Sequence, residues 1–262
     1  MILRRSCVLA VLTGLLSTLV VYCQEKPARL TFEVASVKAS PAGGRGGGIR
    51  AQPGGQRYTA QGAPVKLMIS LMYKIPMRQI TGGPGWIDTD GYDIEAKADR
   101  SYTLDDLHVM FQNLLADRFK LQFHKEAKEG AVYALTVDKS GSKMKVNDSP
   151  QDFNFPISGG KDGITIGSRV NMEYFCWWLG QVLQREERPV IDNTGLKGNY
   201  DFTLAFLPDF PPDFPKENLP PAFLNRPTIF DAVREQLGLR LQAQKGPVEF
   251  FVIDHVEKPA EN

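Results

Sequence analysis

The feature that most constrains the fold is a repeat: the order of local signals in residues 58–146 returns in residues 165–257. A repeat of this kind predicts that one structural unit is built twice, so both copies must suit the same fold. The first helix expected in each copy has four apolar residues at the i, i+3, i+4, i+7 spacing of one helix face. They are Val65, Met68, Ile69 and Met72 in the first copy, and Met172, Phe175, Cys176 and Leu179 in the second.

Two dipeptides follow the first helix of each copy. An Ile-Asp pair stands at 87–88 and again at 191–192, and a Tyr-Asp pair then opens an alternating strand at 92–96 and at 200–204. Alternation of apolar and polar residues is typical of a strand with one buried face. The matched order predicts that both pairs occupy equivalent positions in the two copies.

A second helix is predicted in each copy, and each has the same start signal. Thr103 precedes Asp106 and Thr228 precedes Asp231, which resembles a capping box. The second of these helices is shorter, and Gly238 is a suitable stop for it.

Each copy is expected to close with a β-hairpin. Strands 119–123 and 132–137 would be joined by a charged turn at 125–130, and strands 239–243 and 248–253 by a tight turn at 245–247. The predicted fold class is therefore α+β, with two similar halves from an internal duplication. Each half would have an antiparallel or mixed sheet with two helices on one face.

The N-terminus carries an export signal pattern, with Arg4 and Arg5 before the apolar run 8–22. The run is short for a membrane span of about 20 apolar residues. We therefore expect cleavage before Gln24, which would leave the mature chain without a stable membrane span. The alternative is that the segment is retained as a membrane anchor. The expected location is periplasmic or extracellular. The predicted organisation is a signal peptide at 1–23, a strand and Gly-rich arm at 24–57, the repeats at 58–146 and 165–257, a linker at 147–164, a Pro-rich insertion at 207–227 and a tail at 258–262.

Charge and cysteine content limit the classes of partner and chemistry. The chain has 31 basic and 30 acidic residues, so no global field attracts nucleic acid, and no nucleic-acid partner is expected. Removal of the signal leaves Cys176 as the single cysteine, which rules out an internal disulfide. Because Cys176 matches Ile69 in the repeat, we interpret it as a core residue and not as a nucleophile.

Motifs for catalysis, metals and cofactors are missing from the sequence. The three histidines, His108, His124 and His255, lack metal-ligand spacing. The glycines at 43–48 lie beside Arg45 but lack the Gly-Lys-Ser/Thr ending of a phosphate loop. The acidic stretch 88–93 lacks the final bidentate acid of a calcium loop, which favours a turn. We therefore predict no metal, no cofactor and no catalytic residue of a known type.

Three tryptophans are the candidate binding residues: Trp86, Trp177 and Trp178. The last two are adjacent on a predicted helix, so at least one must point away from the apolar face. An inter-domain contact and a ligand platform are the two interpretations of such an outward tryptophan.

Five longer segments stand out, at 32–38, 79–86, 115–119, 192–200 and 252–259. Together they resemble a large uncharacterised family that is expanded in soil acidobacteria and whose domain also occurs attached to membrane metallopeptidases of the beta-lactam-sensor type. The resemblance implies an exported bacterial protein and, through the fused members, a sensory or interaction role. It implies no catalytic residues, because the family has no assigned activity.

Two functional hypotheses follow. The first is a non-catalytic binding or interaction module of the cell envelope, with a protein or small ligand as its partner and a groove between the halves lined by one of the tryptophans. The alternative is a secreted enzyme of unfamiliar type that uses carboxylates, which requires at least two of them to converge in one cleft. The candidate carboxylates are Asp88, Asp93, Asp192 and Asp201.

Overall fold

The computed structural model describes residues 29–41, 48–150, 153, 155–210, 213–215 and 219–260. The predicted signal peptide, the glycines at 43–47 with Arg45, and parts of the Pro-rich insertion lie outside these residues. Within the described ranges the fold is α+β, with three mostly antiparallel sheets, and every helix is too short or too polar to span a bilayer.

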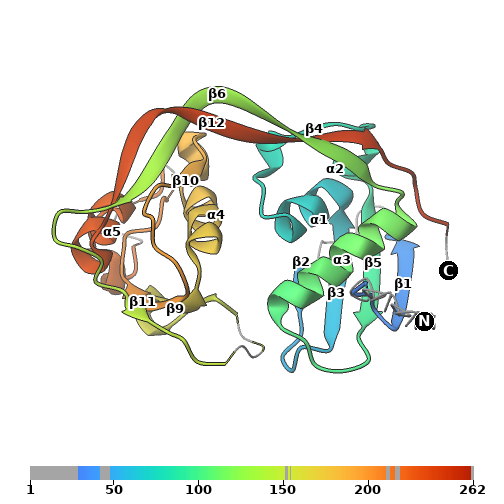
Figure 1. Cartoon of the computed structure of the whole chain (residues 1–262), viewed down its shortest axis with the longest axis horizontal. Coiled ribbons are helices and arrows are strands. Elements are labelled where there is room, and N and C mark those ends of the chain that lie inside the picture. The colour runs from blue at the N-terminus through green and yellow to red at the C-terminus, as the bar shows by residue number, and fades with distance from the viewer. Residues whose placement is uncertain are drawn as a thin grey trace, which may run out of the picture.

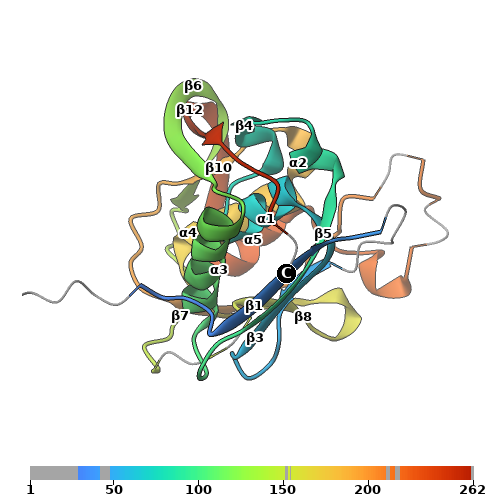
Figure 2. The same ribbon diagram turned by 90° about the vertical axis from the view of Figure 1, so that its right-hand side faces the viewer.

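The first sheet has the order β1-β5-β3-β2 and is antiparallel throughout. Helices α1 and α3 lie on one of its faces (Figure 2), and Tyr92, Ile94 and Ala96 of β5 point to the buried side. The elements are β1 (Val34–Ala39), β2 (Gly48–Ala51), β3 (Arg57–Pro64), α1 (Val65–Met72), α2 (Trp86–Thr89), β5 (Gly91–Lys97) and α3 (Leu104–Arg118). The β2–β3 pair forms a hairpin in the region of the predicted arm.

A second antiparallel sheet has the order β7-β11-β9-β8, and helices α4 and α5 pack with it around a separate core. Its elements are β7 (Lys145–Val146), β8 (Ile157–Gly159), β9 (Thr165–Val170), α4 (Met172–Val182), β11 (Tyr200–Leu204) and α5 (Ile229–Leu237).

The predicted helix signals are confirmed. The apolar stripes of α1 and α4 are buried, including Cys176. Thr103 and Thr228 cap α3 and α5 by accepting from the backbone N–H three residues later, at 3.1 and 3.2 Å. Gly238 ends α5 in the left-handed conformation, with φ of 66°.

The predicted hairpins are wrong. Residues 122–137 form one continuous strand, β6 (Gln122–Val137), and residues 239–255 form another, β12 (Leu239–His255). The two strands pair antiparallel with each other along their whole length, and the supposed turns meet in the middle, where Gly130 is opposite Gly246. Figure 1 shows this β6–β12 ribbon arching over both parts of the molecule.

The ribbon exchanges strands between the two cores. Phe251 and Ile253 from the end of β12 belong to the first core, whose other buried members come from residues 37–121. Tyr133 and Leu135 from β6 belong to the second core, which extends to Leu239. The end of β12, which follows the helices of the second core in the chain, thus completes the first core. The end of β6, which follows the helices of the first core, completes the second.

Two short strands extend the ribbon into a third sheet of order β10-β6-β12-β4. β4 (Ile80–Gly82) runs parallel to β12, and β10 (Val190–Asp192) runs parallel to β6. The expected equivalence of the two Ile-Asp pairs is therefore wrong, because the pair at 191–192 lies in β10 whereas the pair at 87–88 lies in helix α2. The strand that takes the place of β10 beside the first core is β4.

Candidate functional site

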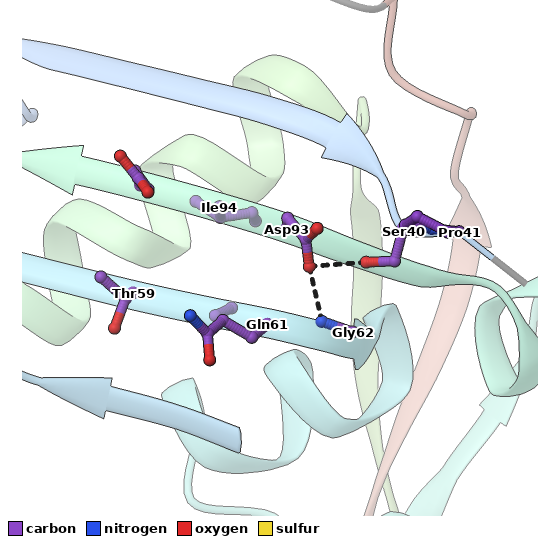
Figure 3. Close-up of a pocket in the computed structure, with 9 residues that line it drawn as sticks. Ser40, Pro41, Thr59, Gln61, Gly62, Asp93 and Ile94 are labelled. Atoms are coloured by element: carbon purple, nitrogen blue, oxygen red, sulfur yellow. Dashed lines mark hydrogen bonds between the residues drawn. The ribbon is translucent and has the colours of Figure 1, made fainter. Parts of the chain in front are cut away.

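The Tyr-Asp pairs hold bulges in the neighbouring strand. In the first sheet, Gln61 and Gly62 lie opposite the single residue Asp93, and Gly62 has a left-handed φ of 56°. The Asp93 carboxylate accepts from the Ser40 hydroxyl at 2.6 Å and from the Gly62 N–H at 2.7 Å (Figure 3). These two hydrogen bonds hold the pKa of Asp93 below its ordinary value.

The same arrangement occurs in the other antiparallel sheet. Asp201 lies opposite the bulged residues Ser168 and Arg169, and Arg169 has a left-handed φ of 52°. The Asp201 carboxylate accepts from the Arg169 N–H at 2.9 Å and from the Asn147 amide at 2.8 Å. Burial raises the pKa of Asp201, but these hydrogen bonds together with the charges of Lys145 and Arg169 outweigh burial and leave the pKa below its ordinary value. Both aspartates therefore stabilise backbone geometry.

The four carboxylates of the enzyme hypothesis do not meet in one site. Asp88 forms an ion pair with Lys66 at 2.9 Å. Asp192 accepts from the Thr194 N–H at 2.9 Å and from its hydroxyl at 2.7 Å. With Asp93 and Asp201 bound to their bulges, each carboxylate has different partners, and no pair of them has the shared surroundings that acid-base chemistry would need.

Of the three candidate tryptophans, two pack against neighbouring parts of the fold. Trp86 contacts Tyr92 with ring centroids 6.2 Å apart, and the Lys258 ammonium lies 5.7 Å from the Trp86 ring centroid. Trp178 packs against the second core, with Phe175 at 5.9 Å and Phe206 at 6.0 Å.

Trp177 instead lines a groove between the two cores, beneath the β6–β12 ribbon. This central groove has a volume of about 310 Å³, near the lower end of the range of about 300–1,000 Å³ for small-ligand pockets. Figure 1 shows α1 and α4 below the ribbon, one in each part of the molecule. The groove residues come from the segment after α1, from α4, from β10 and the residue before it, and from the ribbon. They are Tyr73–Pro76 and Gln79, then Glu173, Cys176, Trp177 and Gly180 of α4, Pro189–Asp192, and Lys125 with Pro247–Glu249 of the ribbon.

The rim of the central groove carries charges of both signs, and both of its lysines already have partners. Lys74 pairs with Asp105 at 3.3 Å and lies 5.8 Å from the Tyr174 ring centroid, which joins the first core to α4. Lys125 pairs across the ribbon with Glu249 at 2.8 Å. A polyanion therefore finds no excess of positive charge in this groove.

Two residues that line the central groove each have a buried polar atom without a hydrogen-bond partner among the described residues, Trp177 Nε1 and Gln79 Oε1, and both atoms are closed off from solvent. Gln79 is 6% exposed, and its Nε2 donates to the Glu249 carbonyl at 2.6 Å. A carbonyl oxygen only accepts, so this bond fixes the orientation of the amide and leaves Oε1 as the free atom. A buried polar group without a partner costs about 1–3 kcal/mol.

His108 Nδ1 is the third such atom in the described part of the chain, but His108 does not line the groove. Its Nε2 lies 3.1 Å from the Tyr58 hydroxyl. Burial, with the nearby charge of Lys74, lowers the pKa of His108 to about 4. The imidazole is therefore neutral at physiological pH.

Two residues of α4 define the groove wall next to Trp177. A Cβ added to Gly180 would meet nothing within 4 Å, so packing does not explain this mid-helix glycine. Cys176 is 5% exposed, and burial raises the pKa of its thiol, with Asp192 adding to the effect. A thiol that resists ionisation is a poor nucleophile, which agrees with its predicted role in the core.

Comparison with models of protein families gives a match. The family model described as "Protein of unknown function (DUF3738)" matches residues 66–256. The chain belongs to the DUF3738 family. No curated protein and no solved structure matches it. The DUF3738 match begins in α1 and ends just after β12, so it contains every residue of the central groove and both strands of the ribbon. The strands β1, β2 and β3 precede it.

Sequence reasoning missed two residues of this DUF3738 groove. Gly180 carried a usable signal, because an isolated glycine inside a helical pattern often has a packing or functional reason. Gln79 carried none, since one glutamine beside a short apolar strand does not differ from a surface residue until the fold buries it.

Proposed function

We propose that this protein is an exported, non-catalytic binding module of the bacterial envelope, and that its ligand site is the central groove. The observation that carries the proposal is a groove of ligand size between the two cores, about 310 Å³ in volume, in whose wall Gly180 leaves open space. The absence of converging carboxylates among the four candidates favours binding over hydrolysis.

Export is part of this proposal. Its support is the charged start and apolar run of residues 4–22 and the resemblance to a family of exported proteins. N-terminal sequencing of the protein recovered from the periplasm or the medium tests it. A chain that begins at Gln24 is the expected product, and a chain recovered only with its N-terminal segment in the membrane fraction contradicts it.

We also propose that the two halves arose by duplication. The support is the repeated order strand, helix, short strand, strand, helix, long strand, together with details that local packing does not require to recur. These details are the matched bulges held by Asp93 and Asp201 and the matched threonine caps. The exchanged strands mean that each half must be compared with its completing strand from the ribbon, and a difference in connectivity on superposition contradicts duplication.

The binding proposal is tested by screening neutral fragments against the ¹⁵N-labelled protein by NMR. We expect hits to shift the indole N–H signal of Trp177 and to leave that of Trp86 unchanged, because Trp86 packs on Tyr92 and does not line the groove. Gly180→Leu is the blocking variant: its side chain begins in open space and extends into the groove. Hits that bind this variant as well as the wild type contradict the central groove as the ligand site.

A further inference from the structure

We propose that the open face of the first sheet, the face turned away from α1 and α3, binds a saccharide chain that carries carboxylate groups. Side chains alternate along each strand, and Val37, Tyr58 and Ile94 point into the first core, so the residues next to them point to the open face. This face is hollowed in two places, with volumes of about 320 and 450 Å³. The two hollows share Thr59 and Glu95 in their walls and therefore form one continuous surface.

Three cations on this face have no counter-ion. Arg50, Arg57 and Lys97 are exposed and line the larger hollow, and none of them forms an ion pair with another described residue. Glu95 lines the same hollow and is likewise unpaired within the described ranges. Residues 42–47 lie outside those ranges, but their sequence contains an arginine and no acid, so they bring no counter-ion.

Two of these cations are set against each other by the register of the sheet. Arg57 of β3 lies directly opposite Lys97 of β5, which places their Cβ atoms about 5 Å apart. Glu95 and Thr59 face each other in the next row, about 7 Å along the strands. Like charges directly opposite each other destabilise a sheet. The Arg57–Lys97 pair is therefore a cost to the fold unless an anion lies between the two side chains.

The second antiparallel sheet shows that this backbone arrangement does not require the charges. Its bulge, held by Asp201 as the first is held by Asp93, fixes which positions correspond in the two sheets. The positions of Arg50, Arg57, Glu95 and Lys97 are taken there by Ser158, Ile164, Thr203 and Ala205, in that order. Neutral residues thus serve at all of these positions, so the charges of the open face need another explanation than the fold.

A carboxylate is the complement of the Arg57–Lys97 pair. Its two oxygens accept from a guanidinium and an ammonium together, and such charge-assisted hydrogen bonds are stronger than neutral ones. A single exposed ion pair contributes little, so useful affinity needs several contacts along the face, which a chain with repeated carboxylates supplies. Glu95 in the next row repels a continuous run of negative charge but accepts from hydroxyl groups. The ligand should therefore have carboxylates separated by hydroxyl-bearing stretches.

The uncharged residues of the open face also favour a saccharide. Ser36, Gln52, Thr59 and Gln61 supply hydroxyl and amide groups that donate and accept, and Figure 3 shows Thr59 and Gln61 along β3. The described residues that line the two hollows include no aromatic side chain, so bases of a single-stranded nucleic acid have nothing to stack on. A protein partner would need buried aromatic or apolar anchors at its centre, which this polar surface does not accommodate.

The test titrates the ¹⁵N-labelled protein with a tetrasaccharide of galacturonic acid and with its methyl ester, which keeps the sugars but removes the charges. We expect the acid to shift the backbone N–H signals of β3 and β5 and to bind about tenfold tighter than the ester, because hydrogen bonds to charged groups are the stronger ones. Added salt should weaken binding of the acid. A glutamate tetrapeptide carries similar charges without the hydroxyl groups and should bind more weakly than the acid.

Two double variants remove the same charges from different surfaces. R57Q/K97Q takes one Arg and one Lys from the open face and should weaken binding of the acid at least about tenfold. R240Q/K245Q makes the same change on β12, where both side chains are exposed, and should leave binding nearly unchanged. K97E places an acid opposite Arg57, so it should lose binding while its Tm stays equal to that of the wild type or rises.

Equal binding of acid and ester, or equal loss in the two double variants, overturns the proposal. A tetrapeptide that binds as tightly as the acid overturns the saccharide in favour of an acidic protein segment. Failure of every probe to shift the β3 and β5 signals overturns the site itself. None of these results bears on the central groove, because no residue lines both surfaces, and loss of fragment binding at Trp177 leaves the open face untouched.

Discussion

Gly180 and Gly238 allow one chemical change to be tested in two opposite surroundings. Both residues adjoin or lie within second-core helices, and Gly→Ala alters the unfolded chain in the same way at each. Their native surroundings differ: a Cβ at Gly180 meets open space, whereas a Cβ at Gly238 overlaps the carbonyl oxygen of Gly141, and Gly238 has a φ of 66°. The signs of the two stability changes should therefore be opposite.

The magnitudes follow from these surroundings. Ala is better than Gly in a helix interior by about 1 kcal/mol, so Gly180→Ala should raise the free energy of unfolding by about that amount and Tm by about 2–4 °C. A left-handed conformation costs a residue with a Cβ about 1–2 kcal/mol, and the overlap with backbone at Gly141 adds to it. Gly238→Ala should therefore lower the free energy of unfolding by at least about 1 kcal/mol.

Urea unfolding followed by tryptophan fluorescence, with calorimetry for Tm, measures both variants against the wild type. A Gly180→Ala protein less stable than the wild type would refute the open space beside α4, and with it part of the argument for the central groove. A Gly238→Ala protein of unchanged stability would refute the left-handed end of α5. If the groove binds a ligand, Gly180→Ala should gain stability while losing affinity, a trade-off expected where a site keeps room for a partner.

Two further predictions concern pH. The folded-state pKa values of Asp93 and Asp201 lie below those of the unfolded chain. Their contribution to stability is therefore present above about pH 4 and is lost as the pH falls through the folded values. In urea unfolding, the double variant D93N/D201N should lose less stability than the wild type on acidification below that point, and an equal loss would contradict the role of these carboxylates in holding the bulges. The pKa of His108 is lowered to about 4, so wild-type stability should fall as the pH decreases from about 6.5 towards that value. His108→Gln should remove this part of the pH dependence, and identical curves for variant and wild type between those limits would show that the imidazole is not buried.

The helices were predictable because their signals are local. The apolar stripe of α1 at Val65 and Met68, and the cap at Thr103, depend on residues within four positions of one another. The structure has them where the spacing predicts. The same reasoning placed Cys176 in the core, since its position in the stripe of α4 decides its environment.

The ribbon was not predictable in this way, because alternation shows that a segment is a strand but not which core it completes. The charged stretch at 125–130 and the sequence Lys245-Gly246-Pro247 have turn-like compositions, yet both lie in the exposed middle of continuous strands. These stretches are polar because the middle of the ribbon, between the two cores, is largely exposed to solvent. The glycines there have a steric reason: a Cβ at Gly130 would meet Val248 at 2.9 Å, and a Cβ at Gly246 would meet Val132 at 3.0 Å.

The candidate site was predictable only in outline. The expectation of a groove between the halves lined by a tryptophan pointed to the region where Trp177 lies, but nothing local separates Trp177 from Trp178 or Trp86. Trp178 packs on Phe175 of the second core, whereas Trp177 lines the groove with residues of β10 and the ribbon, and this difference depends on how β10 and the ribbon pack against α4. Recognition of Gln79 requires the contact with Glu249, 170 positions away in the chain.

The exchanged strands also set the order in which the chain can fold during synthesis. The first core contains Phe251 and Ile253, and β4 finds its partner in β12, so residues 37–121 cannot complete their packing until the last strand has been made. Contacts between segments so far apart in sequence form slowly, because a long loop must close before they contribute. A nascent chain of this topology therefore stays incompletely folded along its whole length until synthesis is nearly finished, which is the state that a secretion channel for unfolded polypeptides can accept.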